Sequence, residues 1–117
     1  MKNEKLFLMV LIAGLLIITM NGCKKCKDEE PRAKIVNNGT QKASVQIKTS
    51  GGNTVNINNV DPSTSSSYNS YAAGQVTFTI KINSIDYVKA LDMANCFDYN
   101  IAIDATNNIT TTAIDRN

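Results

Sequence analysis

Apolar and polar residues alternate over short runs along the chain beyond residue 32. The clearest run is 75–82, and the run 97–104 repeats its pattern. The apolar positions are Val76, Phe78, Ile80 and Ile82 in the first run and Phe97, Tyr99, Ile101 and Ile103 in the second. Alternation with a period of two predicts β-strands that have one buried face and one wet face.

A β-hairpin is predicted in the first half of this region. Residues 43–49 and 54–58 both alternate, and Ser50-Gly51-Gly52-Asn53 between them is rich in turn formers. This pattern predicts two paired strands, with Val55 and Ile57 of the second strand facing inward.

Three further segments are β-rich: 33–37, 85–91 and 109–114. The segment 85–91 also fits a helical turn, although a strand is favoured. Six to eight short strands at close spacing, without a long amphipathic helix, predict an all-β fold. We expect residues 33–117 to form an antiparallel β-sandwich of immunoglobulin-like shape. The Cys–Trp–Cys signature of true immunoglobulin domains is absent, so the likeness is one of shape.

The N-terminus has the parts of an export signal. Lys2 and Lys5 precede an unbroken apolar run from Leu6 to Ile18. Such a run lies within the roughly 7–15 residues of a signal peptide. It is shorter than the roughly 20 apolar residues that span a bilayer. We therefore expect residues 1–22 to be a signal peptide.

The segment Met20-Asn21-Gly22-Cys23 resembles the lipobox of bacterial lipoproteins. The resemblance implies that Cys23 is lipidated after cleavage behind Gly22, so that the membrane is a partner of the chain. A charged tether, residues 23–32, follows. Within it Lys27-Asp28-Glu29 resembles a signal that directs some lipoproteins to the surface of the outer membrane. The simpler alternative is an ordinary secretory signal or an uncleaved anchor with an incidental cysteine, followed by a plain solvated tether.

Composition and charge exclude several classes of function. Basic and acidic residues are equal in number from Ala33 to Asn117, which argues against nucleic-acid binding. The chain has no His, which excludes Ser-His-Asp and Cys-His catalysis and imidazole-ligated zinc. Neither a calcium loop nor a hydrolase cleft fits the regularly spaced aspartates. These are Asp86, Asp92, Asp98 and Asp104. We therefore predict no catalytic residue, no metal and no cofactor.

Cys26 and Cys96 remain after Cys23 is assigned to lipid. In an oxidising compartment they can form a disulfide that ties the tether to the domain. Alternatively, Cys96 is a small buried hydrophobe and Cys26 is free. The second interpretation is slightly favoured, because Cys26 lies among charged residues with no hydrophobic pattern to dock it.

Tyrosines are the residues that suggest ligand contact. Tyr68 and Tyr71 flank a serine-rich loop and are candidate ligand-binding residues, because tyrosine offers contact area at low entropy cost. Tyr87 and Tyr99 are expected in the core or at its rim. The sequence favours a non-enzymatic module of the bacterial envelope that binds another envelope protein or a glycan. A structural, envelope-maintenance role and a carboxylate-based hydrolase are the alternatives.

The order of several landmarks also resembles a family of small β-sandwich domains of unknown function. The landmarks are Ile35-Val36-Asn37-Asn38, Tyr68, Ala73-Gly74, Val76–Ile82 and Phe97–Asp104. That family occurs in bacterial secreted and surface lipoproteins. The resemblance implies a β-sandwich fold and supplies no catalytic residue.

Overall fold

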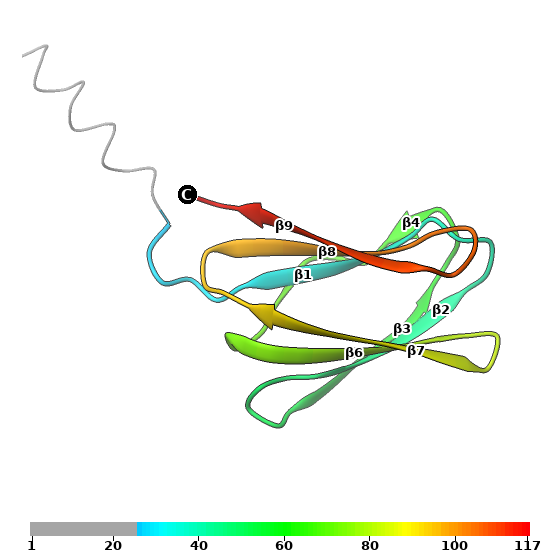
Figure 1. Cartoon of the computed structure of the whole chain (residues 1–117), viewed down its shortest axis with the longest axis horizontal. Coiled ribbons are helices and arrows are strands. Elements are labelled where there is room, and N and C mark those ends of the chain that lie inside the picture. The colour runs from blue at the N-terminus through cyan, green and yellow to red at the C-terminus, as the bar shows by residue number, and fades with distance from the viewer. Residues whose placement is uncertain (1–25) are drawn as a thin grey trace, which may run out of the picture.

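The computed structural model describes residues 26–117, which are all-β with nine strands (Figure 1). The strands are β1 (Arg32–Asn37), β2 (Ala43–Lys48), β3 (Thr54–Val60), β4 (Thr64–Ser65), β5 (Asn69–Ser70), β6 (Gly74–Ile82), β7 (Ile85–Met93), β8 (Phe97–Ile103) and β9 (Ile109–Asp115). The predicted signal peptide and Cys23 lie outside the described residues. No helix in the described part is long and apolar enough to cross a bilayer.

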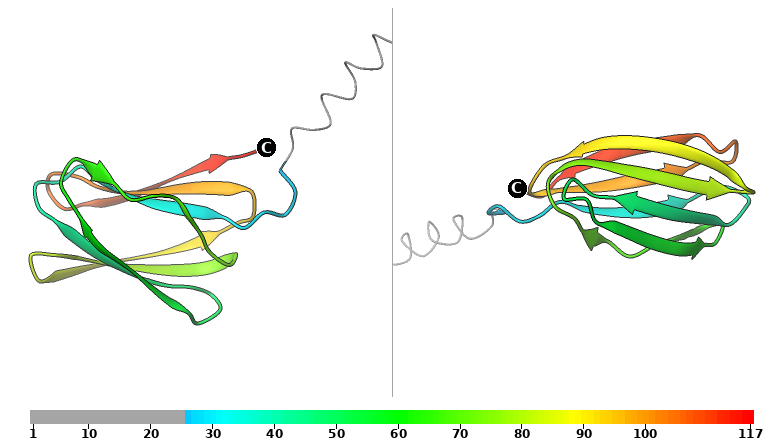
Figure 2. Two further views of the ribbon diagram at one scale, coloured as in Figure 1. Left: turned by 180° about the vertical axis from the view of Figure 1, so that it is seen from behind. Right: turned by 90° about the horizontal axis from the view of Figure 1, so that it is seen from below.

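The strands form two sheets that pack face to face in a β-sandwich-like arrangement (Figures 1 and 2). The five-stranded sheet has the order β4-β1-β8-β9, with β5 also pairing β1. The four-stranded sheet has the order β3-β2-β6-β7. The predicted all-β fold of two sheets is therefore confirmed. The strands exceed the predicted six to eight because the short strand β4 forms in the serine-rich segment 59–67, which was expected to be a loop or an edge crossing, whereas β5 lies in the stretch between Tyr68 and Tyr71 that was expected to be extended.

The prediction that all strand pairs are antiparallel is wrong. β1 and β8 run parallel, in a register that extends from Arg32↔Asp98 to Asn37↔Ile103. The chain leaves β1 for the other sheet and returns to β8 from β7, so it enters β8 at the end where β1 begins. Alternation within one strand determines its buried face. It contains no information on the direction of a partner far away in the sequence.

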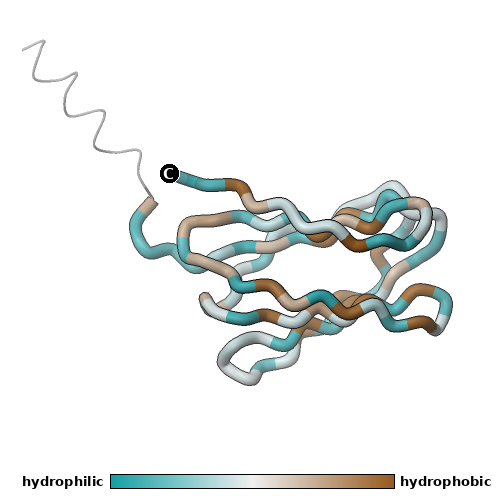
Figure 3. Tube along the Cα trace, in the orientation of Figure 1, coloured by the Kyte–Doolittle hydropathy of each residue, from teal (hydrophilic) through white to brown (hydrophobic). Residues whose placement is uncertain are grey.

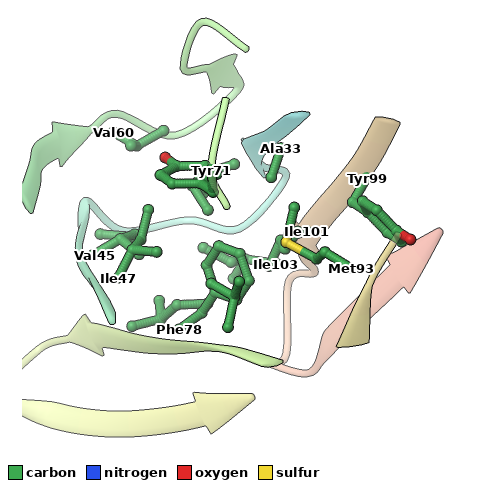
Figure 4. Close-up of a cluster of buried hydrophobic side chains, with 14 of the residues drawn as sticks. Ala33, Val45, Ile47, Val60, Tyr71, Phe78, Met93, Tyr99, Ile101 and Ile103 are labelled. Carbon is green, nitrogen blue, oxygen red and sulfur yellow. The ribbon is translucent and has the colours of Figure 1, made fainter. Parts of the chain in front are cut away.

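The alternating positions of both sheets meet in one core (Figures 3 and 4). The core contains every predicted inward residue of β6, and those of β8 except Phe97, which packs against it. Its members are Ala33, Ile35, Ala43, Val45, Ile47, Val60, Tyr71, Val76, Phe78, Ile80, Ile82, Met93, Tyr99, Ile101 and Ile103. Removing this apolar surface from water is the main force that holds the sheets together.

The β2–β3 hairpin forms as predicted, but the prediction that Val55 faces inward is wrong. Val55 is 36% exposed, and Ile57 is only partly buried. β3 is an edge strand, and the turn before it extends away from the facing sheet (Figure 1). The pairing also shifts register between Ala43 and Val45, and Asn59 opposite has a φ of 61°. This β-bulge increases the local twist of the strand.

Residues 85–93 form strand β7 rather than a helical turn, as favoured from the sequence. β7 pairs with β6 along the whole length of both strands without a register shift. The turn between them consists of Asn83 and Ser84, with φ values of 53° and 66°. Two successive left-handed residues make the tight hairpin turn whose twist matches that of the strands.

Candidate functional site

A disulfide joins Cys26 to Cys96 where the chain enters the domain. The slight preference for a free Cys26 is therefore wrong. The segment around Cys26 is attached to the domain through its backbone: the N–H of Cys96 donates to the carbonyl oxygen of Glu29 at 2.8 Å. A backbone hydrogen bond of this kind leaves no hydrophobic pattern in the sequence. Pro31 is also buried. Residues 26–31, expected to be part of a free tether, are attached to the domain.

Three charged residues form a cluster beside this disulfide, here named the Asp98 cluster: Arg32, Asp98 and Arg116. Arg32 donates two hydrogen bonds to the carboxylate of Asp98, at 2.8 and 2.6 Å. The Nε of Arg116 lies 3.0 Å from Oδ1 of Asp98. These cations, with the hydrogen bonds from Arg32 as the largest cause, hold the pKa of Asp98 below its usual value. Arg116 also pairs with Glu29 at 2.9 Å and thereby attaches the entering segment.

Tyr68 lies across the outer face of the five-stranded sheet. Its hydroxyl donates to Oδ1 of Asn100 on β8 at 2.7 Å. The guanidinium carbon of Arg32 lies 5.1 Å from its ring centroid, and the ammonium of Lys34 lies 4.9 Å from it. Both distances are typical of cation–π contacts. The hydroxyl and the ring of Tyr68 thus contact other residues of the domain. The side chain is only partly buried, so the rest of it is open to solvent.

Tyr71 is placed differently from Tyr68. It is 5% exposed and belongs to the core, and burial raises the pKa of its phenol (Figure 4). The structure therefore does not present Tyr71 on a surface that a ligand could reach. Tyr99 is buried as well, and its hydroxyl accepts a hydrogen bond from the N–H of Ala94 at 2.9 Å. Tyr87 packs against the core, so the expectation for both of these residues is confirmed.

A shallow hollow of about 270 Å³ lies on the outer face of the four-stranded sheet. All four strands of that sheet contribute to its lining. The lining residues are Ser44, Val45, Gln46, Asn56, Asn58, Thr79, Lys81 and Asp86. Apart from Val45 they are hydroxyl, amide or charged residues, so the hollow presents many hydrogen-bonding groups on a small surface.

Strand register brings the lining residues together. Gln46 pairs with Asn56 on one side and with Thr79 on the other, which places three polar side chains in one row across the sheet. Lys81 and Asp86 pair in the adjacent row, and their charged groups are 3.5 Å apart and exposed. The bulge lies beside these rows and curves β3.

The other polar groups of the hollow are unengaged. The side chains of Gln46, Asn56 and Asn58 line the hollow and take part in none of the side-chain hydrogen bonds within residues 26–117, in contrast to the amides of Asn37 and Asn100. The sequence shows each of these residues at a wet strand position. Only the pairing of strands places them side by side, which is why the sequence did not single them out.

The described residues contain no group of three His, Cys, Asp or Glu side chains that could hold a metal ion. The aspartates that recur at regular spacing illustrate why. Asp98 belongs to its cluster with two arginines, whereas Asp104 accepts hydrogen bonds from the N–H of Asn108 and from Thr106 in the turn after β8. These bonds lower the pKa of Asp104, the bond from Asn108 most strongly.

Comparison with known proteins supports the fold. No protein-family model and no curated protein matches this sequence. Among solved structures, the chain is similar to the NMR structure of a protein from Eubacterium rectale, with a TM-score of 0.53 and 12% sequence identity. The match covers 78% of this chain and 96% of that one. At this identity the similarity shows a shared fold and nothing about activity.

Proposed function

We propose that this chain is a lipid-anchored, non-enzymatic binding module of the bacterial cell envelope, and that it holds a neutral glycan in the hollow of the four-stranded sheet. The observation that carries the proposal is the row of unengaged amides and hydroxyls around Gln46. The proposal keeps the predicted class of function and moves the site away from Tyr71.

The chemistry of the hollow suits a saccharide. Amide and hydroxyl side chains both donate and accept hydrogen bonds, as the hydroxyls of a sugar ring do. Adjacent strands are roughly 4.8 Å apart, so the row supplies these groups at a regular spacing. The charges of Lys81 and Asp86 offset each other at the edge of the hollow, which favours a neutral ligand over an anionic one.

Two observations support the envelope location. The Cys26–Cys96 disulfide is typical of proteins in oxidising compartments outside the cytoplasm. The lipobox-like segment that ends at Cys23 supplies the anchor, because two or more acyl chains hold a protein stably on a membrane. With this anchor, the module belongs to the small bacterial β-sandwich lipoproteins, at the outer membrane and exposed on the surface.

The glycan site is tested by binding of the full-length chain, purified in detergent, to an array of neutral and acidic glycans. We expect retention on neutral glycans that Gln46→Ala and Asn56→Ala abolish. Thr110→Ala, an exposed substitution on the other sheet, is the matched control and should bind normally. Loss with Tyr68→Ala and retention with Gln46→Ala would move the site to Tyr68. Silence across the array would favour a structural role.

The anchor is tested independently of the ligand. Cys23→Ser should convert a chain that sediments with membranes into one that is released, because the thiol that accepts the lipid is lost. Membrane fractionation with detection of the incorporated lipid measures this. A Cys23→Ser chain that sediments as the parent does would contradict the anchor and leave the glycan site unaffected.

A further inference from the structure

The two sheets have four free edges in the described part of the chain, and three of them carry features that discourage pairing with another strand. β3 contains the bulge at Asn59. The edge beside β1 consists of two separate two-residue strands. β7 carries Lys89 opposite the buried Phe78, so a charge occupies its core-facing row. Bulges, short edges and inward-pointing charges are known protections of sheet edges.

β9 is the least protected of the four edges, because its one charged residue, Asp115, is the last residue of the strand. It pairs with β8 along its whole length without a register shift. Residues 109–114 contain no charged residue, no Pro and no Gly. A long, regular edge strand without an internal charge is a template for the addition of another strand.

The hydrogen-bonding pattern shows which groups of β9 are free. At one end of the β8–β9 ladder, the N–H of Arg116 donates to the oxygen of Cys96 at 2.9 Å. At the other end, the N–H of Asp104 donates to the oxygen of Asn108 at 3.1 Å. Hydrogen-bonded and non-hydrogen-bonded pairs alternate between these ends. Four residues of β9 therefore direct their N–H and C=O groups away from β8: Ile109, Thr111, Ala113 and Asp115.

Exposed apolar residues lie on β9 and also on β7, the neighbouring edge of the other sheet, but on different faces. Ile114 shares the outer face of the five-stranded sheet with its partner Asp98. Val88 shares the outer face of the four-stranded sheet with its partner Thr79. The exposed large hydrophobic residues of the described part include Ile114 on β9, at 42%, and Ile85 and Val88 on β7, at 54% and 64%. β7 and β9 are the edges of the two sheets on the same side of the sandwich, as the right-hand view of Figure 2 shows. A partner strand beside β9 would remove apolar surface of Ile114 from water as well as satisfy the free edge.

We infer that two copies of this chain pair through β9, in antiparallel orientation, about a twofold axis at Thr112. This register overlaps the whole of β9. It places Thr111 opposite Ala113 and Ile109 opposite Asp115, so that outward-directed backbone groups meet outward-directed backbone groups. The single charge of the strand, Asp115, meets Ile109 rather than its own copy, which avoids like-charge repulsion.

A second copy fits this edge because β9 is its own complement. The pairing joins the five-stranded sheets of both copies into one continuous sheet and places Ile114 of each copy opposite Thr110 of the other, an apolar contact with a β-branched residue. This inference does not depend on the lipid anchor or on the glycan site.

The test uses a single new cysteine in the full-length chain in its native membrane. Residues 112 of the two copies form a non-hydrogen-bonded pair at the axis, with Cα atoms about 4.5 Å apart, within the range that a disulfide spans. Thr112→Cys should therefore yield a covalent dimer on a non-reducing gel after mild oxidation by air. Thr110→Cys is the matched control: it is equally exposed, but it faces Ile114 and should remain monomeric.

Substitutions at Thr111 test whether dimer formation needs the free backbone edge of β9. Thr111→Pro removes an outward N–H and leaves the ladder with β8 intact, and Thr111→Lys copies the charge that Lys89 places on β7. Either one, added to Thr112→Cys, should abolish the dimer. The native Cys26–Cys96 disulfide, read by mass spectrometry, reports that each variant folds.

The outcomes that overturn the inference are distinct from misfolding. They are equal dimer yields from the two cysteine variants, a cross-link to a different protein in place of the homodimer, or no cross-link in a chain with its native disulfide. Sedimentation of the unsubstituted full-length chain in detergent is a second measurement. Twice the monomer mass is expected, and a monomer at all concentrations would overturn the pairing.

Discussion

The two outer faces of the sandwich use their polar residues in opposite ways. On the five-stranded sheet, Asp98 binds two arginines, and Tyr68 is bonded to Asn100. On the four-stranded sheet, the row around Gln46 makes no side-chain hydrogen bond to any other residue of the described range 26–117, and the Lys81–Asp86 pair is exposed at 3.5 Å. The polar side chains of the first face hold the domain together, whereas those of the second face are available to a ligand.

This difference shows why a polar residue on a strand cannot be assigned a role from its type. Asn100 and Asn56 both lie at wet positions of alternating strands. Asn100 accepts a hydrogen bond from Tyr68, which comes from a distant segment, and Asn56 lies in the hollow. Substitutions on the outer face of the five-stranded sheet should therefore change stability, whereas substitutions in the hollow of the four-stranded sheet should change binding alone.

The disulfide should have the largest effect, because it attaches the entering segment to the five-stranded sheet. Cys26 and Cys96 are 70 residues apart, and replacing both by Ser should lower the free energy of unfolding by about 2–5 kcal/mol. Urea denaturation of the full-length chain measures this. Adding reductant to the native chain should give the same loss, and an unchanged midpoint would show that the entering segment is held by its other contacts.

The ion pairs of the two faces provide a matched comparison. Asp98→Asn leaves Arg32 and Arg116 without their carboxylate. Asp98 and Arg116 are largely buried but Arg32 is partly exposed, so we expect a loss of about 2 kcal/mol, below the value for a fully buried pair. Asp86→Asn breaks an exposed pair with Lys81 and should cost less than about 1 kcal/mol. Equal effects in denaturant titrations would remove the distinction between the faces.

Acid should weaken the domain through the Asp98 cluster. The hydrogen bonds from Arg32 lower the pKa of Asp98 in the folded chain. Its contribution is therefore complete above the unfolded pKa of about 3.9 and is lost as the pH falls through the lower folded pKa. Asp98→Asn should flatten the dependence of stability on pH below about 4, and the slope that remains includes Asp104, whose pKa is also lowered. Identical acid slopes in parent and variant would contradict this role.

The smallest effects should still separate the two faces. Tyr68→Phe keeps the ring and removes its hydrogen bond to Asn100, so we expect a loss of about 1 kcal/mol. Gln46→Ala removes an unengaged side chain and should change the free energy of unfolding by less than about 0.5 kcal/mol. Thermal unfolding of the two variants side by side measures the difference. A larger loss for Gln46→Ala would show that the hollow is structural.

Local patterns were sufficient for the strands and for much of the core. The inward residues of β6 were readable because each strand buries every second side chain wherever its sheet packs on another. The same rule wrongly predicted that Val55 is buried, because at this end of the edge strand β3 no facing sheet covers the side chain. For Tyr71 the error is the opposite one: the neighbouring serines indicated a surface position, but the ring lies in the core.

By itself the sequence determined an all-β domain, the positions of most strands, their turns and their buried faces, because these depend on residues close together in the chain. Tertiary structure alone decided the parallel pairing of β1 with β8, the Cys26–Cys96 bond, the Asp98 cluster and the hollow. Each of these joins segments that are remote in sequence. Their partners are selected by how whole sheets pack and align, and no local alternation of residues encodes that choice.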